Sequence, residues 1–170
     1  QQRPTAASSA SPMPAGVLGA AYDERIRFFL DSAMTSVPVT LKIDFVSDVS
    51  CPWCVIGLKS LQQAAERLQG QVALDLHFQP FELNAQMAPE GQDMAEHLME
   101  KYGATPEQSQ QNRDAITQRG AALGFTFNMG QRSRIYNTFD AHRLLHWAGQ
   151  EGAQGQQLAL KMALFSAYFT

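Results

Sequence analysis

The stretch DFVSDVSCPWC, residues 44–54, decides the fold of this chain. It joins the end of an apolar run to the first residues of a helix-like pattern. It also holds Cys51 and Cys54, the two cysteines of the 170-residue sequence. A C-x-x-C placed beside a strand–helix pattern is typical of a redox motif. We therefore expect a pair of thiols at the start of a helix.

Strand-like patterns lie on both sides of the helix that begins at this motif. Over residues 41–46 apolar side chains alternate and then merge, which predicts a largely buried strand beginning at Val39. Pro52 suits a first helical turn, where its missing N–H has no intrahelical partner. One helical face carries Leu58, Leu61, Ala65 and Leu68. Residues 72–78 alternate again, so the order strand–helix–strand predicts a right-handed parallel βαβ unit.

After Asn84 the pattern changes to helices only. They are expected at 92–101, from Thr105 to Gly124, from Asn137 to about 148, and from about 153 onward. The predicted organisation is a disordered or weakly helical leader over 1–38, a βαβ part over 39–84 and a helical insert domain over 85–170. Two strands make an unsatisfactory sheet by themselves. Because the last helical pattern runs to Thr170 without a cap, we expect a truncated chain that lacks the C-terminal part of its sheet.

Composition excludes several classes of protein. A net charge of −3 offers no electrostatic basis for binding nucleic acid or an anionic membrane. No apolar run approaches the roughly 20 residues that span a bilayer. No secretory signal is seen, so a cytoplasmic location is expected, although the chain begins with Gln and an upstream segment could precede it.

The two cysteines are predicted to have different roles. The thiolate is the reactive form of cysteine, and unpaired N–H groups at a helix start stabilise negative charge. Cys51 precedes the first turn, so its pKa should be lowered. Cys54 lies one turn further on the same side and can attack a mixed disulfide formed by Cys51. Pro52 stiffens the connection, and Trp53 offers an apolar surface beside the sulfur.

Other interpretations of the cysteine pair are weaker. A C-x-x-C can be half of a zinc site, but there is no second pair. His142 and His146 have a suitable mutual spacing, yet they lie far beyond the separation found in a zinc finger. A structural disulfide or idle thiols would not explain the placement at a helix start. No metal is therefore expected.

Two further side chains could support the chemistry. Asp48, three residues before Cys51, could act as an acid–base group near the sulfurs. The simpler interpretation is a carboxylate that solvates the turn. His142 could border the site, or it could be an ordinary surface or packed helix histidine.

Residues 44–57 resemble the active-site segment of the DsbA-like thioredoxin superfamily, and the branch they resemble most is that of the FrnE-like dithiol–disulfide oxidoreductases. Residues 80–84, PFELN, follow the second strand as in that branch. Residues 137–144, NTFDAHRL, resemble a motif of its helical insert. Kappa-class glutathione transferases and 2-hydroxychromene-2-carboxylate isomerases are similar, but they carry Ser where Cys51 stands.

The resemblance implies an α/β thioredoxin-like fold interrupted by a helical insertion after the second strand. It assigns Cys51 as the nucleophile and Cys54 as the resolving thiol, with the helices covering a groove to which Phe81, Asn137 and His142 are expected to contribute. The family also has a cis-proline loop opposite the cysteines. No proline of this sequence stands in that place, in agreement with the expected truncation.

Three functions follow as hypotheses. The first is a thiol–disulfide oxidoreductase or isomerase that exchanges disulfides with protein or small-molecule thiols. It would need no cofactor beyond its Cys51–Cys54 disulfide, with glutathione as a candidate co-substrate. The second is a glutathione-dependent transferase or isomerase of the same fold. The third is a non-enzymatic peptide-binding or chaperone module.

Overall fold

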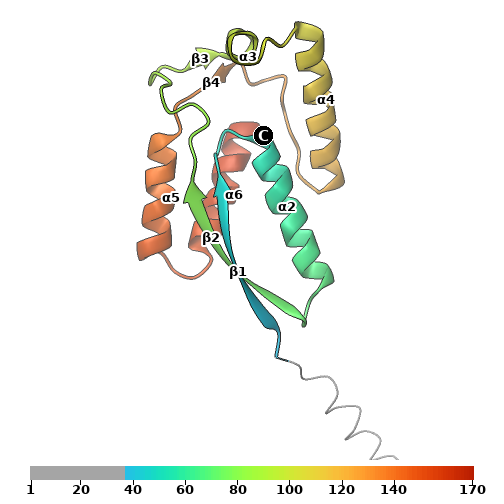
Figure 1. Cartoon of the computed structure of the whole chain (residues 1–170), viewed down its shortest axis with the longest axis vertical. Coiled ribbons are helices and arrows are strands. Elements are labelled where there is room, and N and C mark those ends of the chain that lie inside the picture. The colour runs from blue at the N-terminus through green and yellow to red at the C-terminus, as the bar shows by residue number, and fades with distance from the viewer. Residues whose placement is uncertain (1–36) are drawn as a thin grey trace, which may run out of the picture. The chain divides into compact units, whose positions relative to one another are not determined.

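A parallel pair of strands forms the centre of the computed structural model, which describes residues 37–170 (Figure 1). Strand β1 covers Val39–Ser47, helix α2 covers Pro52–Arg67 and strand β2 covers Val72–Pro80. The strands pair in parallel, with Val39 opposite Val72 and Ser47 opposite Pro80. The predicted strand–helix–strand unit is therefore confirmed. Because both strands end at the same edge, that edge brings the start of α2 and the segment after β2 together.

Four helices follow the strand pair, as the sequence predicts. They are α3 (Met94–Tyr102), α4 (Pro106–Ala122), α5 (Phe139–Glu151) and α6 (Gln156–Phe169). The expectation of helices only was wrong in one respect, because β3 (Gln92–Asp93) pairs antiparallel with β4 (Arg134–Ile135). Strands of two residues are too short to show an alternating pattern. Figure 1 shows this ribbon beside α3, at the end of the molecule where α2 begins.

Polar side chains determine where α3 and α4 begin. Asp93 accepts hydrogen bonds from the backbone N–H groups of Ala95 at 2.9 Å and Glu96 at 3.1 Å. Thr105 and Gln108 form a reciprocal capping box at the start of α4. These caps satisfy N–H groups that no helical carbonyl can reach.

One apolar core joins α2, β2, α4 and α6. Its buried members are Val55, Leu58, Phe78, Ile116, Phe125, Phe127, Phe165 and Phe169. Phe45 of β1 packs edge-on against Phe78 of β2, with ring centroids 5.8 Å apart. Two sequence-based expectations need correction. Leu68 is 43% exposed because α2 ends at Arg67. Most of β1 is exposed, with Val46 at 60%, and its Ile43 and Phe45 are only partly buried.

Residues 38–170 form one compact unit. The predicted leader over 1–38 lies almost entirely outside the described residues, and the proposed boundary between residues 84 and 85 stays a prediction. Among the helices from residue 37 onward, none combines the length and the apolar character needed to cross a membrane.

Candidate active site

The cysteine motif lies where β1 turns into α2. Cys51 is the residue that precedes the helix, with an extended backbone, and Pro52 occupies its first turn. The N–H of Cys54 donates to the carbonyl of Cys51 at 3.1 Å, which closes the first turn and holds the two residues on one side of the helix. Both cysteines are partly buried free thiols. The structure thus places them as the sequence predicts.

The two sulfurs have opposite acid–base properties. A hydrogen bond from the Cys54 thiol lowers the pKa of Cys51 to about 7, against the effect of burial, with help from the backbone N–H groups of Cys54 and Trp53. The same hydrogen bond raises the pKa of Cys54, because its proton is held by the neighbouring sulfur, and burial raises it further. As the pH rises through about 7, therefore, Cys51 becomes the thiolate of the pair while Cys54 keeps its proton.

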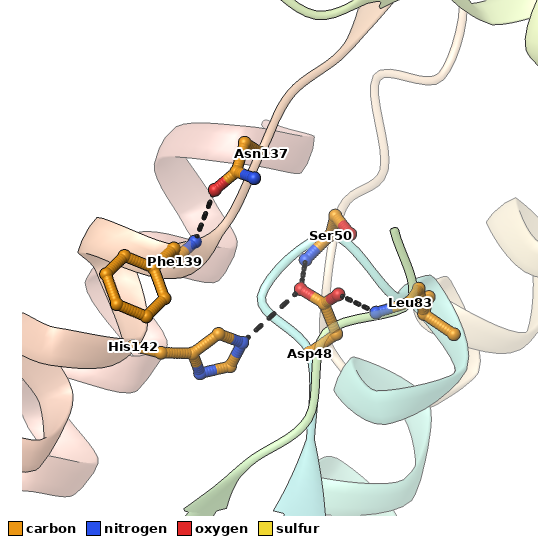
Figure 2. Close-up of polar contacts among 6 residues, drawn as sticks. All are labelled: Asp48, Ser50, Leu83, Asn137, Phe139 and His142. Carbon is orange, nitrogen blue, oxygen red and sulfur yellow. Dashed lines mark hydrogen bonds and ion pairs between the residues drawn. The ribbon is translucent and has the colours of Figure 1, made fainter. Parts of the chain in front are cut away.

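Asp48 is a buried carboxylate beneath this turn, with 1% of its side chain exposed. It accepts hydrogen bonds from the N–H of Ser50 at 3.0 Å and from the N–H of Leu83 at 2.7 Å (Figure 2). Burial by itself would raise the pKa of Asp48, but His142 and these two N–H groups outweigh it and lower the pKa to about 2. The interpretation of Asp48 as a solvated turn residue was wrong. It ties the cysteine turn to the segment after β2.

His142 of α5 faces the same carboxylate. Its Nε2 lies 3.7 Å from Oδ1 of Asp48, an ion-pair distance when the imidazole is protonated, and 6% of the side chain is exposed. Figure 2 shows His142 pointing from α5 toward the turn that carries Asp48 and Ser50. His142 therefore lies behind the motif, in contact with Asp48, and does not border an open groove.

The other two predicted groove residues lie apart from the cysteines. Asn137 accepts a hydrogen bond from the N–H of Phe139 at 2.8 Å and donates to the carbonyl of Met87 at 3.0 Å. It therefore fixes the start of α5 against the segment that follows β2, and Figure 2 shows its bond to Phe139. Phe81 is 52% exposed, and its N–H donates to the carbonyl of Ser47 at 3.3 Å.

Lys161 of α6 is a site residue that the sequence analysis missed. Its side chain is 1% exposed, and its Nζ lies 5.0 Å from the ring centre of Phe165 and 5.8 Å from that of Phe78. Burial lowers the pKa of Lys161 to about 8, and the nearby groups Cys54, Asp48 and Cys51 act against this when they are ionised. The signal was its spacing, since residues 161, 165 and 169 form one buried face of α6.

A cavity of about 450 Å³ opens beside Cys51. It lies between the first turn of α2, the segment after β2, helices α3 and α4, and residues 129–135. Trp53, 47% exposed, stands at its edge and is covered on its ring face by the guanidinium of Arg119 at 5.1 Å. A substrate held in this cavity would meet the sulfur of Cys51 first.

The described part of the chain contains no group of three or more His, Cys, Asp or Glu side chains arranged to hold a metal ion. The side chains around the motif offer a thiolate, a protonated second thiol, a buried carboxylate and a buried amine.

Comparison with known proteins agrees with this arrangement. The family model of the DSBA-like thioredoxin domain matches residues 42–170. The crystal structure of a probable DsbA oxidoreductase from Streptomyces coelicolor is similar, with a TM-score of 0.66 and 31% sequence identity. The match covers 75% of this chain and 53% of that chain, so this chain spans about half the length of that protein. Comparison with curated proteins gave no match.

These findings confirm the resemblance to the DsbA-like thioredoxin superfamily, and with it the thioredoxin-like α/β fold. The matched residues include both cysteines, Asp48, His142 and Lys161. The chain belongs to the family of DsbA-like thioredoxin domains.

Proposed function

We propose that this protein is a thiol–disulfide oxidoreductase in which Cys51 is the attacking sulfur and Cys54 the resolving one. The observation that carries the proposal is the difference between the two thiols at one helix start. A shared hydrogen bond lowers the pKa of Cys51 to about 7 and raises that of Cys54. A thiol with a pKa near the ambient pH combines a large thiolate fraction with good nucleophilicity.

The reductive half of the cycle begins at Cys51. Its thiolate attacks one sulfur of a substrate disulfide, forms a mixed disulfide and releases the other substrate sulfur as a thiolate. Cys54 then loses its proton to solvent and attacks the Cys51 sulfur. The second substrate thiolate leaves, the enzyme becomes a disulfide, and the substrate has gained two electrons. In the reverse direction a substrate dithiol reduces the Cys51–Cys54 disulfide through the same intermediate.

The surrounding residues have positioning roles in this proposal. Asp48 holds the turn before Cys51 through the N–H of Ser50, and His142 lies against the same carboxylate. Lys161 supplies positive charge that favours the thiolate of Cys54 at the moment of attack. Asp48 and His142 belong to the stretches that resemble the FrnE-like branch, and this resemblance supports placing the protein in that branch.

Two serine variants test the proposal. The wild-type chain should reduce the disulfides of insulin in the presence of dithiothreitol, and Cys51→Ser should lose this activity. Cys54→Ser should instead accumulate a mixed disulfide with the substrate, visible by mass spectrometry as an adduct on Cys51. Retained activity in Cys51→Ser would show that the sulfur of Cys51 is not the nucleophile.

A further inference from the structure

The cavity beside Cys51 has an unusual distribution of charge. Arg113, Arg132 and His97 line it, and no Asp or Glu from the described part of the chain does so. The other lining residues are largely apolar, with Met94, Ile116 and Met129 among them. A low-polarity pocket with cationic groups and no counter-charge strengthens any attraction to an anion, because little water screens it.

Arg132 lines this cavity and has buried N–H groups without a hydrogen-bond partner in the part of the chain that the structure describes. Its Nε and Nη1 are buried and have no hydrogen-bond partner among residues 37–170. Its Nη2 contacts only the Sδ of Met94, at 3.2 Å, which is a weak acceptor. Buried guanidinium N–H groups normally have partners, and leaving them without one is costly.

The aromatic contacts of Arg132 explain the position of its guanidinium group, but they give no hydrogen-bond partner to the N–H groups at the edge of that group. The guanidinium carbon is 4.6 Å from the ring centre of Tyr168 and 4.8 Å from that of Phe169. Such stacking satisfies the flat face of the guanidinium. It provides no acceptor for the N–H groups at the edge, and a carboxylate is the acceptor that arginine binds best.

We propose that this cavity binds a small thiol or disulfide that carries a carboxylate, with the carboxylate on Arg132 and the reacting sulfur at Cys51. The inference rests on the proposed disulfide exchange and adds the chemical class of the substrate. A volume of about 450 Å³ lies within the range of small-molecule sites, roughly 300–1,000 Å³. The exchange itself is the two-electron reaction described above, in which Cys51 forms the bond to the substrate sulfur and Cys54 releases it.

Two disulfide reagents of similar shape and different charge test the proposal. One is 5,5′-dithiobis(2-nitrobenzoate), with a carboxylate on each ring, and the other is 4,4′-dithiodipyridine, which is uncharged at pH 7. Stopped-flow absorbance gives the second-order rate constant of the reduced protein with each. The ratio of the two constants cancels any change in the reactivity of Cys51 itself.

Arg132→Gln should lower this ratio about tenfold, the loss expected for one charge-assisted hydrogen bond. Arg143→Gln is the matched control, because Arg143 is 70% exposed and pairs with Asp140 at 3.1 Å away from the cavity. It should keep the wild-type ratio. A ratio in Arg132→Gln within twofold of wild type would overturn the proposal.

A second measurement needs no variant at Arg132, whose loss could weaken packing against Tyr168. S-methylglutathione carries carboxylates but cannot exchange disulfides, so it should slow the reaction of the wild-type protein with the anionic reagent. Its diethyl ester should not. Equal effects of the two compounds, or inhibition by an acidic peptide alone, would overturn the assignment to a small carboxylate. Failure of the proposed disulfide exchange at Cys51 would give another result, because Cys51→Ser would then react with both reagents as fast as wild type.

Discussion

Asp48→Asn should remove a defined, pH-dependent part of the stability of this protein. The carboxylate of Asp48 accepts two backbone N–H groups, from Ser50 at 3.0 Å and Leu83 at 2.7 Å, and is 1% exposed. An asparagine of the same shape has one oxygen instead of two. One of the two N–H groups would then face an amide NH₂ group, and the negative charge beside His142 would be gone.

The magnitude follows from the pKa of Asp48, which falls from 3.8 to about 2 in the folded protein. Each pH unit of such a difference corresponds to about 1.4 kcal/mol, so the ionised carboxylate stabilises the fold by about 2 kcal/mol at pH 7. A carboxyl whose pKa is lowered by folding contributes this stability above the unfolded value, near 3.8. The contribution is lost as the pH falls through about 2.

Urea unfolding of wild type and Asp48→Asn at pH 7, 5 and 2 measures this contribution. Wild type should be more stable by about 2 kcal/mol at pH 7 and 5, and the difference should largely vanish at pH 2. Asp44→Asn is the matched control at pH 7, since Asp44 is exposed and bonds only the side chain of Gln79. A difference between wild type and Asp48→Asn that stays constant from pH 5 to pH 2 would refute the reasoning.

Three further predictions concern the sulfurs and the core. The alkylation rate of Cys51 by iodoacetamide should rise with pH through a midpoint near 7, because only the thiolate reacts and its pKa is about 7. Lys161→Met should raise the melting temperature, because a buried ammonium with a pKa of about 8 is removed, and should slow the release of substrate from the mixed disulfide. Gly120→Ala should lower the free energy of unfolding by about 1–3 kcal/mol, because its Cβ would collide with the ring of Phe127.

Each of these has its own control. Cys54→Ala removes the thiol hydrogen bond to Cys51 and should move the alkylation midpoint upward, so an unchanged midpoint would contradict the assigned cause. Lys42→Met changes an exposed lysine and should leave release of the mixed disulfide at the wild-type rate. Gly130→Ala meets open space and should cost little, and equal losses in the two glycine variants would show that the contact with Phe127 is unimportant.

Local sequence patterns were sufficient to predict the parallel βαβ unit that carries the cysteine motif. Alternation over residues 41–46 and 72–78, with a helical pattern between them, identified the parallel βαβ unit. Pro52 identified the start of α2. Because Cys51 precedes this start and Cys54 lies one turn further along the helix, the sequence predicts different roles for the two cysteines. These features depend on neighbours in sequence, so a single chain is enough to find them.

What only the tertiary structure decided is the surroundings of the sulfurs. Asp48 is a buried ionised group because Leu83, 35 residues away, and His142 of α5 lie against it. Lys161 and Arg132 come from segments far from the motif, and nothing in the sequence places either of them beside the cysteines. The physical reason is that the desolvation and charge interactions of a side chain depend on distances in space, which the spacing of residues along the chain does not determine.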